Sequence, residues 1–124
     1  MQNLLWIAAA GGMGALARYG LGGLVQRLWG FSFPWGTFAV NIAGCFLFGL
    51  VWALAESRFA ISGQVRLIVL TGFMGSFTTF STFVFESGML LRDGQYLYAL
   101  ANMIGQNLVG LVALFLGLAL ARAL

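Results

Sequence analysis

Four apolar stretches take up most of this 124-residue chain and constrain its fold more than any other feature. They cover residues 4–24, 36–55, 67–91 and 97–121. A helix of about 20 residues crosses ~30 Å of hydrocarbon, so each stretch is long enough to span a membrane. Only 7% of the residues are charged, whereas a soluble domain carries roughly 25%. We therefore expect an all-α integral membrane protein, with residues 1–124 forming a single four-helix transmembrane domain. The first stretch lacks a basic flank and a cleavage site, so we interpret it as a retained helix rather than a signal peptide.

The arginines indicate how such a protein would insert. The chain has six arginines, no lysine and a net charge of +3. Four spans would put Arg58, Arg66 and Arg122 on one side of the membrane, and Arg27 and Arg92 on the other. Orientation follows the difference in positive charge between the two sides. This near balance predicts dual topology, in which copies insert both ways up and pair as an antiparallel homodimer. The arginines form no cluster, so we expect no nucleic-acid partner.

Composition also argues against enzyme chemistry. There is no histidine, only three acidic residues, and one cysteine, Cys45, inside the second span. A Ser-His-Asp triad is therefore excluded, and a conventional zinc site lacks its ligands. Cys45 is interpreted as a small packing residue. We expect the protein not to be an enzyme.

The third span contains a segment that is poorly suited to a helix. Residues 71–83 read TGFMGSFTTFSTF. Glycines and β-branched hydroxyl residues are poor helix formers. At bilayer depth they predict a third helix that is broken in mid-membrane and resumes near Thr78. Backbone groups released by such a break line a site rather than lipid. The hydroxyls and phenylalanines together point to an ion or small solute.

Phenylalanines and hydroxyl residues follow this segment on different faces. Phe80 and Phe83 are three residues apart and share one face, while Thr79, Thr82 and Glu86 share another. The positive edge of a phenyl ring can face an anion, and hydroxyls such as that of Ser81 can donate to it. Glu86 has two interpretations: a carboxylate solvated near the membrane surface, or one that binds protons or cations.

Other spans carry polar residues that need partners in hydrocarbon. Asn41 either links helices or donates to a permeating anion. Arg18 either bonds backbone carbonyls or draws anions toward a vestibule. Asn102 and Gln106, four residues apart, either pair with the Thr79–Glu86 face or line water, and we favour lining.

Three motifs, in this order, resemble those of the CrcB/Fluc family of small bacterial fluoride channels. They are GGMGALARY at residues 11–19, GTFAVN at 36–41 and the run at 71–83. The last is highly specific, and the resemblance covers essentially the whole chain. Ser76 stands where many members have a second glycine, and Asn102 and Gln106 are amides where tyrosine, serine or histidine is expected.

The resemblance implies an antiparallel dual-topology dimer with two separate pores. It implies that Asn41, Phe80 and Phe83 contribute to the fluoride pathway. It also implies a structural sodium ion, not transported, held at the dimer centre by backbone carbonyls of Gly75 and Thr78 from both subunits.

By the same resemblance, Arg18 lies near the vestibule and Glu86 at the outer end of the polar track. That track would include Thr79, Ser81 and Thr82, with Asn102 and Gln106 from the fourth span.

The leading hypothesis is a fluoride-selective channel in the bacterial inner membrane, where passive export gives resistance to fluoride. Its partners would be fluoride, a second copy and the lipid bilayer. The alternative is a proton-coupled small multidrug exporter of organic cations. Such exporters rely on a glutamate in the first span, where this chain has Arg18 and no acid. A third interpretation, a non-transporting membrane scaffold, leaves the expected helix break unexplained.

Overall fold

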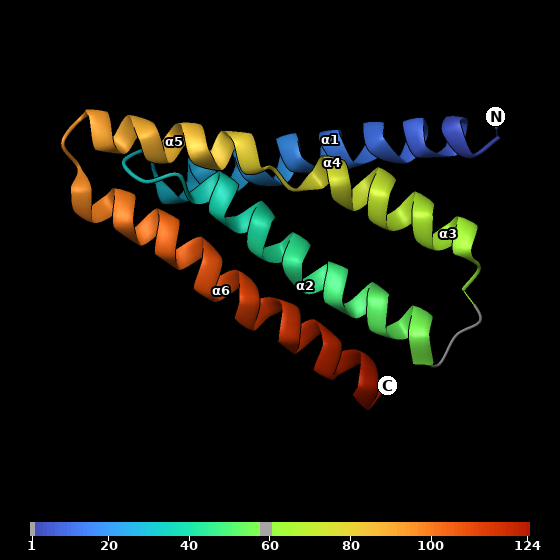
Figure 1. The fold of residues 1–124 in the computed structure, drawn as a ribbon. Coiled ribbons are helices and arrows are strands. Elements are labelled where there is room, and N and C mark those ends of the chain that lie inside the picture. The colour runs from blue at the N-terminus through green and yellow to red at the C-terminus, as the bar shows by residue number, and fades with distance from the viewer. Residues whose placement is uncertain (1, 58–60) are drawn as a thin grey trace.

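The computed structural model describes residues 2–57 and 61–124, and over these ranges its regular structure is helical (Figure 1). Arg58, counted above in the charge balance, lies outside the described residues. The elements are α1 (Gln2–Trp29), α2 (Trp35–Ser57), α3 (Gly63–Leu67), the π-helix η1 (Ile68–Met74), α4 (Gly75–Phe77), α5 (Phe80–Arg92) and α6 (Tyr96–Ala123).

Four helical segments are long and apolar enough to cross a membrane, which confirms the expected all-helical, four-span chain. They are Gln2–Trp29, Trp35–Glu56, Gly63–Arg92 and Tyr96–Ala123. Each contains one of the predicted stretches. The helices extend a few residues beyond these stretches at both ends.

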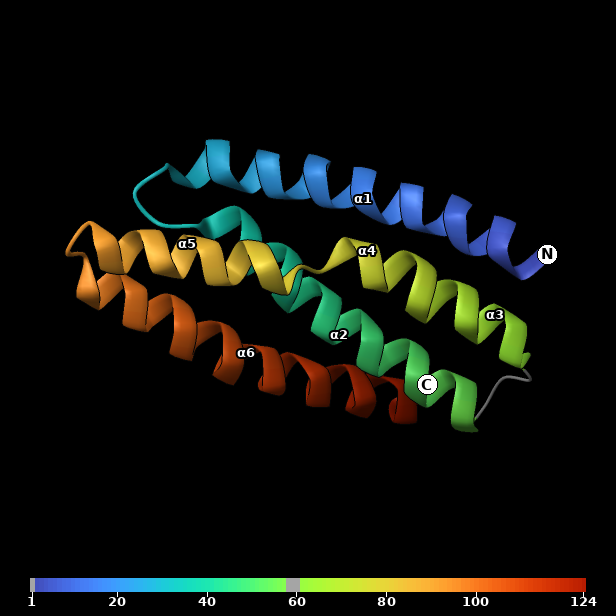
Figure 2. The same ribbon diagram turned by 45° about the horizontal axis from the view of Figure 1, so that its top comes forward.

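The helices run side by side along one axis (Figures 1 and 2). The N-terminus, α3 and the C-terminus lie at one end, and the α1–α2 and α5–α6 connections lie at the other. The main packing partners are α2 with α6, α1 with η1, α2 and α4, and α5 with α6. The third span therefore packs mainly against α1 through η1 and α4, and against α6 through α5.

Two glycines let the helix backbones approach closely. A Cβ built on Gly117 of α6 would lie 2.1 Å from the carbonyl oxygen of Phe46 on α2. One built on Gly14 of α1 would lie 2.3 Å from the carbonyl oxygen of Phe73 in η1. Both distances are far inside van der Waals contact, so these contacts require glycine. Membrane helices commonly pack through such small residues.

The third span leaves helical geometry at two residues. Thr78 has φ −89° and ψ 160°, and Thr79 has φ −149° and ψ 122°, so both are extended. Thr79 is the N-cap of α5, because its hydroxyl accepts a hydrogen bond from the Thr82 N–H at 3.3 Å. Such caps satisfy N–H groups that have no partner within the helix. The sequence interpretation placed the restart near Thr78. The structure places it at Phe80, and residues 71–77 stay helical within η1 and α4.

Candidate functional site

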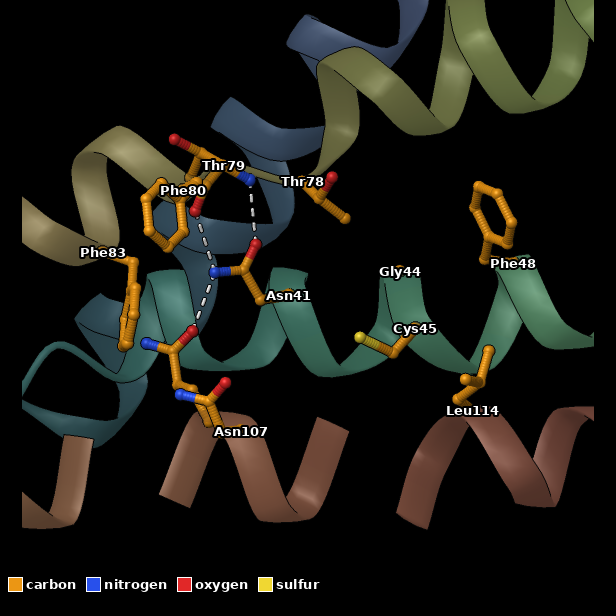
Figure 3. Close-up of a pocket in the computed structure, with 11 residues that line it drawn as sticks. Asn41, Gly44, Cys45, Phe48, Thr78, Thr79, Phe80, Phe83, Asn107 and Leu114 are labelled. Carbon is orange, nitrogen blue, oxygen red and sulfur yellow. Dashed lines mark hydrogen bonds between the residues drawn. The ribbon is translucent and has the colours of Figure 1, made fainter. Parts of the chain in front are cut away.

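A cavity of about 360 Å³ lies where the third span is interrupted, between α2, α5 and α6 (Figure 3). None of its lining residues is charged. The lining residues are Asn41, Gly44, Cys45, Phe48, Thr78, Thr79, Phe80, Phe83, Gln106, Asn107 and Leu114.

Asn41 connects α2 to the interruption. Its Oδ1 accepts from the Thr79 N–H at 2.9 Å, and its Nδ2 donates to the Thr79 carbonyl at 3.0 Å (Figure 3). The amide therefore satisfies two backbone groups of a residue outside the helical ladder. Nδ2 also donates to Gln106 Oε1 at 2.7 Å. An asparagine amide has two N–H donors, so both are in use. Asn41 links helices here, and it would have to break one of these bonds to donate to an anion.

Two phenyl rings form part of the cavity wall. The ring centroids of Phe80 and Phe83 are 5.9 Å apart, and the rings are tilted by 47°. Both lie in the lining (Figure 3). The side chain of Phe80 is 76% exposed in the single chain. The cavity is therefore open beside Phe80.

The hydroxyl residues of this region are divided between the cavity and its surroundings. Thr78 and Thr79 line the cavity. The Thr79 hydroxyl donates to the Thr82 hydroxyl at 3.0 Å. Neither Thr82, which is half-buried, nor Ser81, which is exposed, belongs to the lining.

Asn102 and Gln106 of α6 occupy different positions. Gln106 lines the cavity and is 7% exposed. Asn102 is completely buried, and it donates to Ser87 Oγ on α5 at 2.9 Å and accepts from Gln106 Nε2 at 2.9 Å. The interpretation that Asn102 lines water is therefore wrong for this structure. One of its N–H groups donates to Ser87 and its carbonyl oxygen accepts from Gln106, and its side chain is not part of the cavity lining.

Arg18 lies away from this cavity. Its Nε donates to the carbonyl of Ser76 at 3.0 Å, across the α1–α4 contact. Its side chain also lines a second cavity of about 420 Å³, together with Tyr19, Arg27 and Thr37. Of the two interpretations of Arg18, the bond to a backbone carbonyl is observed. The other interpretation, that Arg18 draws anions toward a vestibule, stays a prediction.

Glu86 lies outside the first cavity as well. It lines a third cavity of about 320 Å³ with Gln26, Ser32 and Asp93. Glu86 is half-buried, and its Oε1 has no hydrogen-bond partner among the described residues.

The residues expected to bind sodium are both near the interruption. Gly75 is the first residue of α4 and is exposed in the single chain. Thr78 is half-buried, and its hydroxyl donates to the Met74 carbonyl at 3.0 Å. The extended ψ of Thr78 turns its carbonyl out of the helical ladder.

Sequence reasoning missed several members of this site. Cys45, Phe48, Asn107 and Leu114 line the cavity without having been assigned to it. Ser87 was not identified at all, although it is buried and bonds Asn102. Its only sequence signal is a serine four residues after Phe83, a spacing at which a hydroxyl can bond the preceding turn's carbonyl.

Comparison with known proteins identifies the family. Residues 5–118 match the family model described as "CrcB-like protein, Camphor Resistance (CrcB)". A protein of Nitrosococcus oceani named "Fluoride-specific ion channel FluC" is 60% identical over 121 residues, which cover 98% of this chain and 97% of that protein. One of the same name from Solidesulfovibrio magneticus is 57% identical over 122 residues, 98% of either chain. Another, from Desulforapulum autotrophicum, is 51% identical over 121 residues, or 98% of this chain and 97% of that one. Because these matches run along nearly the whole sequence, the chain belongs to the CrcB family.

Proposed function

We propose that this protein is a fluoride-selective ion channel that exports fluoride passively and so protects the cell from it. The observation that carries the proposal is the uncharged cavity, where two phenyl rings meet amide and hydroxyl groups. Relatives that align with the whole chain are named fluoride-specific ion channels. An ion channel transforms no substrate, so no catalytic residue is assigned.

Selectivity would come from replacing the hydration shell of a small anion. Hydrogen-bond donors and phenyl edges, both positively polarised, would take the place of water. Phe80, Phe83 and Gln106 are the residues that would supply them in the cavity. Asn41 holds the site together by bonding Thr79 and Gln106. Thr79, whose N–H and hydroxyl already donate to Asn41 and Thr82, would act at the edges of the proposed pathway with Ser81 and Thr82, and Asn102 would hold Gln106 in place.

The working unit would be an antiparallel, dual-topology homodimer in the bacterial inner membrane. The near balance of arginines supports insertion both ways up. The exposure of Phe80 supports a second subunit as well. Its ring lines the cavity, yet most of its side chain is not covered by its own chain.

A structural sodium ion would lie at the centre of that dimer. Backbone carbonyls of Gly75 and Thr78 from both copies would hold it. The donor chemistry fits, since hard cations prefer oxygen ligands and the Thr78 carbonyl has left the helical ladder. The ion would join the subunits and would not be transported.

The exporter alternative has no support in this site. Its required acid is missing from α1, and Glu86 lies in a different cavity from the phenyl pair.

Proteoliposomes loaded with fluoride distinguish the two mechanisms. A channel releases fluoride down its gradient with no proton gradient imposed, and Glu86→Gln leaves uptake of a lipophilic cation at the background level. Proton-driven accumulation of such a cation, abolished by Glu86→Gln, would instead establish the exporter.

A further inference from the structure

One continuous chain of hydrogen bonds crosses the bundle beside the cavity. It starts at the backbone N–H of Thr79, ends at the backbone carbonyl of Phe83, and passes through four side chains. The bonds run from Thr79 N to Asn41 Oδ1 (2.9 Å), Asn41 Nδ2 to Gln106 Oε1 (2.7 Å), Gln106 Nε2 to Asn102 Oδ1 (2.9 Å), Asn102 Nδ2 to Ser87 Oγ (2.9 Å) and Ser87 Oγ to Phe83 O (2.8 Å).

The two backbone ends fix the direction of every bond in this chain. A backbone N–H can only donate, and a backbone carbonyl can only accept. Amide groups could otherwise be turned by 180°, since their oxygen and nitrogen ends have similar shapes. Turning any one of the three amides here would set two donors or two acceptors against each other. The orientation of Gln106 is therefore determined by groups on α2 and α5.

The fixed orientation leaves a hydrogen-bond donor at Gln106. Both N–H groups of Asn41 are used, one on the Thr79 carbonyl and one on Gln106. One N–H of Gln106 is used on Asn102. The other has no partner among the described residues, and the side chain lines the cavity that also contains both phenyl rings.

We propose that Gln106 is the amide that donates to the permeating anion, and that Asn102 and Ser87 are positioning residues that hold its N–H toward the cavity. This inference rests on the proposed function, and it assigns a structural role to Asn41. An anion accepts strongly from a neutral N–H group. A nearly buried N–H without a partner is unfavourable, so the site favours an occupant that accepts. Without these bonds, Gln106 could turn its carbonyl oxygen toward the cavity.

Fluoride efflux from proteoliposomes tests both roles. Gln106→Met keeps the length of the side chain and removes the amide, and it should slow efflux about tenfold or more, the loss expected for one hydrogen bond to a charged group. Ser87→Ala should slow efflux in the wild-type background, while Ser87→Thr, which keeps the hydroxyl, should restore it. Gln64→Met makes the same change at an exposed position away from these cavities and should leave efflux unchanged.

The double variant separates positioning from general stability. If Ser87 acts through Gln106, adding Ser87→Ala to Gln106→Met causes no further loss. An equal further loss in both backgrounds would overturn the positioning role, and wild-type efflux in Gln106→Met would overturn the donor role. If Gln106→Met does not fold, equal efflux from Ser87→Ala and Ser87→Thr overturns the proposal. A wild-type protein that releases no fluoride would instead overturn the proposed function itself.

Discussion

Asn41 is the residue on which the geometry of the site depends most. Its amide accepts from one backbone group of Thr79, donates to another, and also donates to Gln106. An extended residue inside a membrane span needs partners for its N–H and carbonyl. Asn41 provides them with no net charge, and it ties this interruption to α6.

Replacing Asn41 with aspartate should therefore abolish most fluoride efflux. The carboxylate would place an acceptor against the Thr79 carbonyl and Gln106 Oε1, and an unpaired buried acceptor costs about 1–3 kcal/mol. It would also add negative charge beside an anion pathway. We expect Asn41→Asp to slow efflux from proteoliposomes by about 100-fold or more, given these combined effects.

The matched control is Asn3→Asp, which makes the same change at an exposed position near the start of α1. It should conduct at the wild-type rate. Efflux at the wild-type rate from Asn41→Asp would show that Asn41 has no part in fluoride conduction.

At the scale of the elements, the interruption of the third span is short because side-chain hydrogen bonds stabilise the helix end before it and the helix start after it. The Thr78 hydroxyl donates to the Met74 carbonyl in the preceding turn, and Thr79 caps α5. Only two residues need to be extended. The π-helix η1 comes directly before α4, and π-helical segments within α-helices are frequently found at functional sites.

The contact between α2 and α6 gives a stability prediction at this scale. In Gly117→Ala the added methyl would meet the backbone of Phe46, which cannot rotate away. Overpacking of this kind costs typically 1–3 kcal/mol, so thermal unfolding in detergent should occur at a lower temperature. Gly88→Ala on α5 meets nothing within 4 Å and should unfold at or above the wild-type temperature. Equal unfolding temperatures for the two variants would show that the α2–α6 distance is not set by Gly117.

The sequence predicted the residue types of the site better than their connections. Apolar length located all four spans, and poor helix formers located the interruption to within a few residues. Phe80 and Phe83 could be paired because they are close in sequence on one helix. The bonds of Asn41 to residues 38 and 65 positions away could not be predicted, because they depend on how α2, α5 and α6 pack. The same holds for Ser87, whose partner Asn102 is on another helix.

At the scale of the whole molecule, the chain is a multi-pass membrane protein whose cavity is open beside Phe80. The near balance of arginines predicts that copies insert in both orientations. Cytoplasmic and periplasmic reporters fused after Leu124 should therefore both be active. Gln64→Arg adds one positive charge on the side of Arg66 and should shift the chain toward a cytoplasmic C-terminus. A wild-type chain in which only one reporter is active would contradict dual topology.

Selective fluoride release is the most direct test of the central claim that this cavity conducts fluoride. Purified protein is reconstituted into liposomes loaded with equal concentrations of fluoride and chloride, and the efflux of each anion is followed with its own electrode. The account predicts rapid loss of fluoride while chloride stays inside, because the donors and phenyl edges enclose a small, strongly hydrated anion. Comparable efflux of both anions, or retention of both, would contradict it.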